Sequence, residues 1–305
     1  MRRSIPAFLA MVAILLFMSA CGSNSSSSLS AGQVIINTSS AMKQLKTVHV
    51  NMTVAVTAGV SGLPTTTTGS STPNSYTINI NGSGDEVLPD QASLKVSLGG
   101  FGSNYSFAEI TKGQQVYIQN KQGQWYVIDK SKLSSNSSTS ALSNASVPDF
   151  NKLLDLAQKN AKLTDHGDET LNGASLRHIS VTLDKNGIKQ LLQSYGQLQG
   201  MTGTSQQTFD QFFNSAKDLN ATLDFWIDES TSYLHRFEMK FNLNLDLSQF
   251  ITPTPGSTTT SGAGTSIKFD AIIDLSKFND PSIKISAPPN AIPTDDPSVI
   301  FSSGI

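Results

Sequence analysis

Cys21 is the residue whose type and position most plainly imply chemistry. It is the only cysteine in the 305-residue chain. Arg2 and Arg3 lie near the start, an apolar run covers residues 5–18, and small residues occupy positions 19 and 20 directly before the thiol. A short basic segment, an apolar segment and small residues before a cleavage point form the pattern of a secretory signal. We therefore predict that the chain is exported and cleaved just before Cys21.

The segment around Cys21 resembles the lipobox of bacterial lipoproteins, although Met18 stands where that pattern prefers Leu. The resemblance implies a lipoprotein signal peptide over residues 1–20 and a covalent diacylglycerol or acyl lipid on Cys21. The mature chain would then be anchored to the cell membrane on its extracytoplasmic side. The alternative is an uncleaved transmembrane anchor, for which residues 5–20 fall slightly short of the roughly 20 apolar residues that a bilayer needs.

Catalytic or metal-binding constellations are not visible elsewhere in the sequence. It contains no His-Glu-x-x-His helix, no Gly-x-Ser-x-Gly elbow and no phosphate-binding glycine loop. The chain is therefore predicted not to be an enzyme and to need no cofactor apart from the lipid on Cys21. Four histidines occur singly among predicted strands and turns, where surface or hydrogen-bonded roles are expected rather than metal binding: His49, His166, His178 and His235.

Three acidic residues, Asp165, Asp168 and Glu169, surround His166 just before a predicted hairpin. They could bind a cation, but a solvated acidic turn is the preferred interpretation. Trp125 and Trp226 lie in predicted strands, and packing in the core or on a sheet face is preferred over a sugar-binding role.

Composition limits the classes of partner. After removal of residues 1–20, the chain keeps 285 residues with 19 basic and 23 acidic side chains, a net charge of −4. No basic cluster is present, so binding to nucleic acid is not expected. No cysteine remains for an internal disulfide, so packing must hold the fold together. The membrane, through the anchor on Cys21, is the partner that these observations predict.

Hydrophobic periodicity divides the mature chain into a tether, one domain and a tail. Residues 21–29 are Ser-rich and predict a flexible tether. Residues 30–290 predict one domain, which begins with a helix at Ser30, and residues 291–305 predict a C-terminal tail. Within the domain, apolar and polar residues alternate with a period of two, which predicts strands at residues 50–56, 76–80, 94–98, 105–110, 115–119, 124–129, 177–183, 223–227, 237–247 and 267–275.

Helices are predicted in the middle of the domain, near residues 149–161, 184–195 and 204–216, because apolar residues recur there at helical spacing after capping residues. Tight links at residues 120–123 and 171–174 predict hairpins. Three inserts rich in Ser, Thr, Gly and Pro, at residues 58–73, 131–146 and 251–266, predict loops rather than domain boundaries.

These elements predict an α+β fold, in which a single wide, curved antiparallel sheet forms a half-barrel and amphipathic helices cover its concave apolar face. Two interpretations stay open at this point. The helices and sheet could pack to a solid core, or they could leave an apolar cavity between them.

Several features together resemble the LppX/LprA/LprF/LprG family of actinobacterial lipoproteins. They are the lipobox, the early helix before a long strand, the hairpin containing Tyr117, Gly123 and Trp125, the strand at residues 225–228, and the ending at residues 287–289. The Ser/Thr-rich inserts and the long strand at residues 237–247 depart from the family pattern. The resemblance implies an incomplete barrel similar to the LolA and LolB carriers, which would hold an acylated lipid or glycolipid in its cavity and carry or present it at the cell envelope.

Apolar side chains on the predicted helices and on the longest strand are the candidates for lining such a cavity. The aromatic stripe of the third helix would serve equally well as ordinary core. The rival function is a lipid-anchored interaction or sensor module with a solid core, and an envelope hydrolase is a more remote third. The candidate lining residues are Phe150, Leu153, Leu154, Phe209, Phe212, Phe213, Phe237, Met239 and Phe241.

Overall fold

The computed structural model divides the chain into two compact units, Met1–Ser30 and Ala31–Ile305. It describes residues 29–61, 75–100, 102–133, 153–154, 161–194, 207, 210, 213, 216–246, 264–296 and 299. Cys21 and the signal segment lie outside the described residues, and the account below concerns the second unit. None of the described helices is long and apolar enough to cross a membrane.

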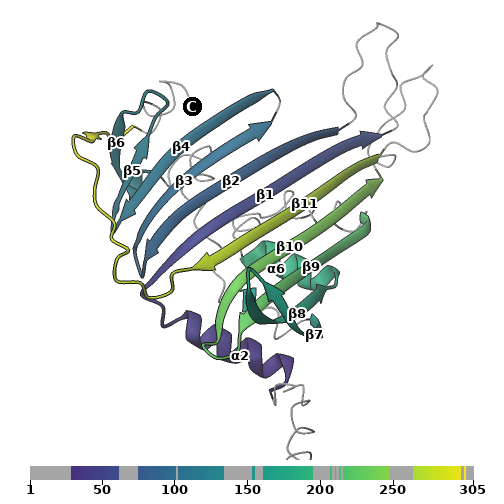
Figure 1. The fold of residues 1–305 in the computed structure, drawn as a ribbon. Helices are drawn as coiled ribbons and strands as arrows, with labels where there is room; N and C mark the ends of the chain where they lie inside the picture. Colours follow the sequence, from purple (N-terminus) through teal and green to yellow (C-terminus); the bar gives the residue numbers. More distant parts are fainter. Residues whose placement is uncertain are drawn as a thin grey trace, which may run out of the picture. The chain divides into compact units, whose positions relative to one another are not determined.

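One twelve-stranded sheet dominates the second unit, in the order β12-β6-β5-β4-β3-β2-β1-β11-β10-β9-β8-β7 (Figure 1). The sheet is curved and does not close. Its strands are β1 (Thr47–Ser61), β2 (Ser75–Val87), β3 (Gln91–Gly100), β4 (Ser103–Lys112), β5 (Gln115–Gln119), β6 (Trp125–Asp129), β7 (Ala161–Leu171), β8 (Ala174–Leu183), β9 (Ala216–Asp228), β10 (Tyr233–Asp246), β11 (Gly264–Ser276) and β12 (Ile292–Pro293).

The antiparallel pairing of β1 with β11 joins two halves of the sheet. It extends from His49 opposite Ser276 to Ser61 opposite Gly264. On one side of it lie β2 to β6, and on the other lie β7 to β10. Every other pair of neighbours is also antiparallel, except β12, which runs parallel to β6. The sheet is therefore mixed at this edge, where a purely antiparallel sheet was predicted.

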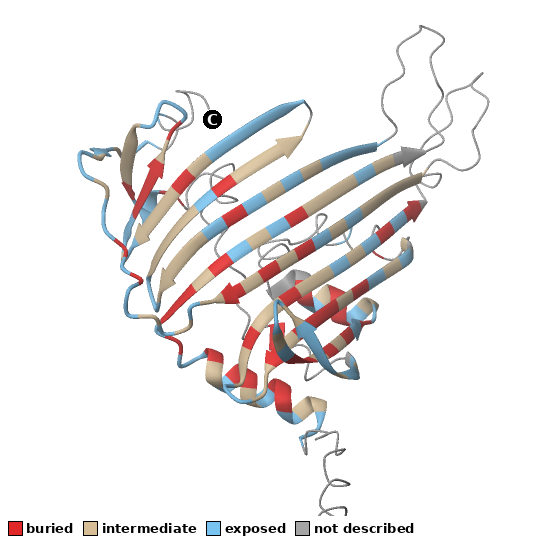
Figure 2. Cartoon of the chain, viewed as in Figure 1, coloured by how far each residue is buried: buried red, intermediate tan, exposed pale blue. Residues whose placement is uncertain are grey.

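Alternation of residue type explains why these segments form strands. Side chains of successive strand residues point to opposite faces, so a period of two gives the sheet one apolar and one polar face. In β10, Phe237 and Leu243 are buried, whereas Lys240 and Asn242 between them are exposed. Figure 2 shows this alternation of buried and exposed residues along the long strands.

Two helices pack against one half of the sheet. Helix α2 (Ala31–Met42) contacts β10 and β7, and α6 (Lys185–Ser194) contacts β8 and β9. Asp184 caps α6, because its carboxylate accepts a hydrogen bond from the Gly187 amide at 2.8 Å. The third helix of the described residues, α3 (Lys130–Leu133), is a single turn after β6. Buried residues of α2 and α6 join those of β8 to β11 and β1 in one main core.

The predicted fold class is confirmed. Both predicted hairpins are present, and most of the predicted strands are longer than expected. Two predicted helices extend too far, because Ala161 begins β7 and Ala216 begins β9. Strand β1 also continues to Ser61, past the predicted start of the first insert. Residues 292 and 293, expected in the tail, form β12. The rest of the three inserts lies largely outside the described residues.

Gly84 in β2 allows a close approach to β3. A Cβ atom at this position would lie 2.1 Å from the backbone oxygen of Ser93, a contact that the sheet can relieve only by moving a strand. At Gly82 the nearest atom to a Cβ would be the Met52 methyl group at 3.1 Å, which is the end of a flexible side chain.

We predict that Gly84→Ala lowers the free energy of unfolding by about 1–3 kcal/mol, because overpacking forces backbone shifts. Gly82→Ala should cost clearly less. Urea denaturation of both variants checks this, and equal effects would contradict it.

Candidate functional site

The apolar face of the sheet is continuous across both halves. Directly opposite residues of neighbouring strands share a face. One row across eight strands is Val181, Leu223, Met239, Ala271, Val54, Ile80, Leu98 and Tyr105.

Burial changes along this row. Val181 and Leu223 are fully buried, Ile80 and Leu98 are half-buried, and Tyr105 is 37% exposed. Ala271 and Val54 in the middle of the row are also buried, so the face is well covered from β8 to β1 and less covered on β2 to β4.

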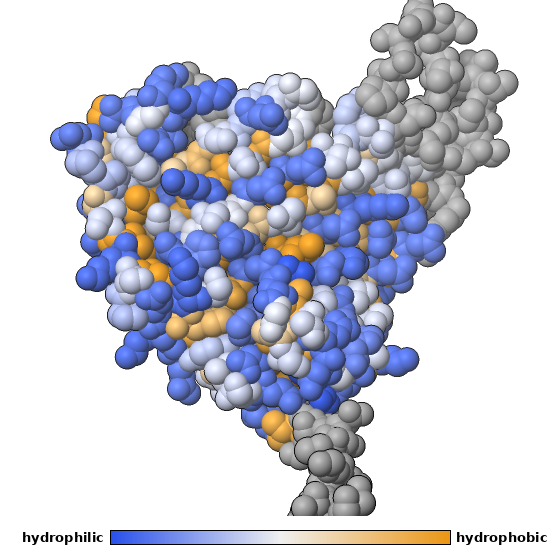
Figure 3. All heavy atoms as spheres, viewed as in Figure 1, coloured by the Kyte–Doolittle hydropathy of each residue, from blue (hydrophilic) through white to orange (hydrophobic). Residues whose placement is uncertain are grey.

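Half-buried apolar side chains gather on the part of this face formed by β1 to β4. This set was not singled out from the sequence, although the alternation in residues 76–80 and 94–98 marks several of its members. In Figure 3 hydrophobic residues also appear between hydrophilic ones on the surface in view. We call this set the open apolar face, and its residues are Val56, Ile78, Ile80, Leu94, Leu98 and Phe107.

The predicted lining residues that are described lie in the covered half. Leu153, Leu154 and Phe237 are each 1% exposed, and Phe213 is 7% exposed, all within the main core. Met239 and Phe241 are half-buried against that core. Four of these six are therefore packed core side chains, and the other two lie half-buried beside them. Phe150, Phe209 and Phe212 lie outside the described residues.

Two carboxylates interrupt the open apolar face. Glu86 in β2 lies opposite Val48 and Ala92, and Glu109 in β4 lies opposite Leu94. Burial raises the pKa of Glu86 from its ordinary 4.5 to about 7. Burial also raises the pKa of Glu109, against the opposing effects of a hydrogen bond from Thr111 and the charge of Lys130.

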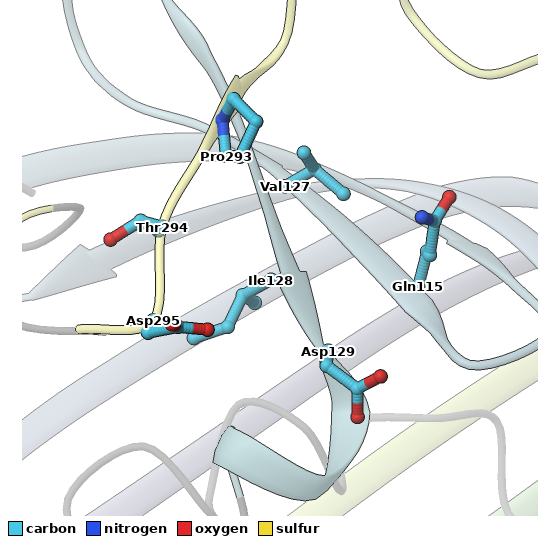
Figure 4. Close-up of a pocket in the computed structure, with 7 residues that line it drawn as sticks. All are labelled: Gln115, Val127, Ile128, Asp129, Pro293, Thr294 and Asp295. Atoms are coloured by element: carbon cyan, nitrogen blue, oxygen red, sulfur yellow. The ribbon is translucent and has the colours of Figure 1, made fainter.

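A pocket of about 330 Å³ with a mixed polar and apolar lining lies between β6 and the C-terminal segment (Figure 4). Polar side chains line it, including Gln115, Asp129, Thr294 and Asp295. The Asp129 carboxylate already accepts hydrogen bonds from the amide and hydroxyl of Ser131, which lower its pKa. This pocket differs in place and polarity from the predicted apolar cavity, and none of the predicted lining residues borders it.

Three rings form a stack across β7, β8 and β9, on the polar side of the sheet. The ring centroids of His166 and His178 are 4.4 Å apart, and those of His178 and Trp226 are 4.3 Å apart. Glu169 accepts hydrogen bonds from His178 Nδ1 at 2.8 Å and from Trp226 Nε1 at 3.0 Å. Both histidines are therefore hydrogen-bonded, as predicted, and their stacking is an addition that the sequence did not indicate. Sheet-face packing of Trp226 is confirmed.

Hydrogen-bond directions in this cluster are set by its carboxylates. Asp224 can only accept, so the Ser180 hydroxyl donates to it. His166 Nε2, 2.8 Å from Ser180 Oγ, must then be the donor to that oxygen. A serine nucleophile would instead donate its proton to a histidine. The convergence of Ser180, His166 and Asp224 is therefore a hydrogen-bonded chain rather than a nucleophile with its base.

The acidic residues of the β7–β8 hairpin are bound by this chain's own donors. Asp165 accepts a hydrogen bond from Arg177 Nε at 2.8 Å, and Glu169 is held by His178 and Trp226. The three acidic residues are exposed, as predicted, but they lie within β7 rather than in a turn, and two of them accept hydrogen bonds from side chains of the same sheet. Within the described part of the chain, no group of three or more metal-ligating side chains is arranged to hold an ion.

Comparison with known proteins gives distant structural likenesses. No family model matches the chain, and no curated protein matches it in sequence. LprF from Mycobacterium bovis is similar over 85% of this chain and 96% of its own, with 15% identity and a TM-score of 0.39. The lipoprotein LppX from Mycobacterium tuberculosis is similar over 84% and 100%, with 16% identity and a TM-score of 0.34.

A putative outer membrane lipoprotein-sorting protein domain from Vibrio parahaemolyticus is similar over 83% of this chain and 93% of its own, with 10% identity and a TM-score of 0.25. The structural neighbours thus include two members of the family that the sequence resembles. At these TM-scores the likenesses carry no argument about function, which must rest on the residues themselves.

We predict that Glu86→Gln stabilises the fold at pH 8 and has little effect at pH 4.5. A carboxyl whose pKa is raised by folding costs stability progressively as the pH rises from 4.5 to about 7, and the cost is constant above that. The expected gain is up to about 3 kcal/mol. Urea denaturation at both pH values measures it. Asp270→Asn, an exposed carboxylate on the opposite face, serves as control, and a Glu86→Gln variant less stable than wild type at pH 8 would contradict the expectation.

We predict that acid lowers the stability of the Glu169→Gln variant less than it lowers the stability of the wild type. Hydrogen bonds from His178 and Trp226 lower the pKa of Glu169. Its contribution to stability is therefore complete above its ordinary pKa of 4.5 and is lost as the pH falls through the folded value. Thermal unfolding at pH 7 and pH 3.5 should show a smaller difference for Glu169→Gln than for wild type. Trp226→Phe, which removes one donor and keeps an aromatic ring, should be intermediate, and parallel pH profiles would refute this assignment.

Proposed function

We propose that the chain is a membrane-tethered lipoprotein that binds an acylated lipid or glycolipid on the open apolar face and carries or presents it at the cell envelope. Cys21 would bear the anchoring lipid, and residues 21–29 would tether the domain to the membrane. Binding and release would need no covalent chemistry. An envelope transporter that supplies or receives the lipid fits the same proposal.

The observation that supports lipid binding is the unequal burial of one continuous apolar face. Its part on β8 to β11 is packed into the main core together with Val48 and Val50 of β1, whereas its part on β2 to β4 keeps side chains such as Ile80 and Leu98 half-buried. Each acyl CH₂ group moved from water onto such a surface gains about 0.8 kcal/mol. A chain of ten such groups would therefore gain several kcal/mol before the cost of ordering is subtracted.

A second candidate is a lipid-anchored interaction or sensor module with a solid core. It is favoured by the position of Leu153, Leu154, Phe213 and Phe237, which were expected to line a cavity and instead are packed in the main core. In this case the polar face or a sheet edge would contact an envelope partner. The two candidates differ in one measurable property, because only the first requires the folded domain to bind a lipid non-covalently.

We predict that the chain from Gly22 onward, which contains the whole Ala31–Ile305 unit, purifies with about one lipid per molecule or takes up a fluorescent lipid. Mass spectrometry of extracted lipid and fluorescence titration measure this. A protein that is empty and takes up no lipid would favour the interaction module.

Leu98→Asp should weaken lipid uptake by about tenfold or more, because it removes a leucine contact and places a charge among acyl chains. Ser97→Asp, one residue away and on the opposite face of β3, makes the same addition of charge and should leave uptake unchanged. Circular dichroism establishes that both variants are folded. Equal uptake by the two variants would place the lipid elsewhere.

A further inference from the structure

Glu86 is an unusual residue for its position. Its neighbours across β1 and β3 are Val48 and Ala92, and its neighbour along the same face of β2 is Gly84. Among the described residues, the Glu86 carboxylate has no hydrogen-bond partner and no ion-pair partner. Burial alone accounts for its raised pKa of about 7. A carboxylate that is partly removed from water and has no partner costs free energy. The fold thus holds an uncompensated negative charge beside the open apolar face.

Glu109 adds to the negative potential of the same region. It lies two strands away on the same face and two residues along, so its backbone is roughly 12 Å from that of Glu86. Unlike Glu86, it already has local compensation. Thr111 donates a hydrogen bond to its carboxylate at 3.2 Å, and the charge of Lys130 lowers its pKa. Glu86 is therefore the carboxylate that a ligand would most strongly stabilise.

Small residues flank Glu86 along β2 and directly across β3 on the apolar face. Gly82 and Gly84 precede Glu86 on β2, and Ala92 lies opposite it on β3. They present no long side chain next to the carboxylate. The apolar residues Ile80 and Leu98 follow along the same face, farther from this end of the strands. A ligand with a polar group at Glu86 could therefore extend an acyl chain toward Ile80 and Leu98.

We infer that Glu86 is the headgroup anchor of the open apolar face and that it selects a lipid with a primary ammonium group. This inference rests on the proposed function. An ammonium group would give the Glu86 carboxylate both a partner of opposite charge and hydrogen-bond donors, whereas a hydroxyl group would give it only a donor. An anionic headgroup would be repelled by Glu86 and Glu109 together. The partner is thus an amine-bearing lipid.

Three lipids with identical acyl chains and a fluorescent label on one chain test this assignment. They are phosphatidylethanolamine, its N-acetylated derivative and diacylglycerol. Titrations use the chain from Gly22 at pH 8, above the pKa of Glu86 of about 7. The wild type should bind the amine about tenfold more tightly than its N-acetylated derivative, which is the effect expected of one hydrogen bond to a charged group.

Glu86→Gln should reduce that preference to less than about threefold and leave diacylglycerol binding unchanged. Asp270→Asn removes a carboxylate from the opposite face and should keep the full preference. Equal binding of the amine and its N-acetylated derivative by wild type, or a preference that survives in Glu86→Gln, would overturn the inference and leave the proposed function intact.

A tighter complex with a galactosyl diacylglycerol than with phosphatidylethanolamine would likewise overturn the assignment of an amine, because hydroxyl groups would then be the preferred donors. Failure of the wild type to bind any of these lipids would overturn the proposed function itself, and the inference with it. Unfolding of Glu86→Gln would contradict the gain in stability predicted for that variant, and Glu86→Ser would then test the preference in its place.

Discussion

The pairing of β1 with β11 is the contact on which the rest of the structure depends. It joins strands that lie more than two hundred residues apart in the sequence, as in the pair Val50 and Leu275. Its register places the apolar residues of β1 level with those of β11, so that two half-sheets share one apolar face. A shift of one residue would turn the apolar side chains of one half toward the polar face. The packed core and the open apolar face both follow from this register.

The two halves of the sheet use the same alternation for different purposes. On β8 to β11, large side chains such as Phe225 and Phe237 meet helices α2 and α6 and form the main core. On β2 the small residues Gly82 and Gly84 follow half-buried Ile80 on the same face. The first half supplies the stability of the fold, which allows the second half to keep apolar surface and the uncompensated Glu86. Function is proposed where burial is incomplete.

Local periodicity made the strands and the fold class predictable, because alternation with a period of two is visible within a few residues. Helix ends were less predictable, since Ala161 and Ala216 continue an apolar stripe at helical spacing and also begin a strand. The stack of His166 on His178 depends on an irregularity of register between Asp165 and Gly167, which no local pattern shows. The candidate lining residues were selected because they are large and apolar. Large apolar side chains are also the ones that pack most readily in the core, as Phe237 does.

An open sheet leaves two edges that could pair with other chains and so promote aggregation. Both edges carry features that hinder such pairing. At one edge β7 carries the irregularity near Gly167 and several charged side chains, which interrupt a regular ladder. At the other edge β12 covers part of β6 with two residues, one of which is Pro293 and has no amide hydrogen to donate. Many copies of this chain could therefore be crowded together without their sheets joining edge to edge.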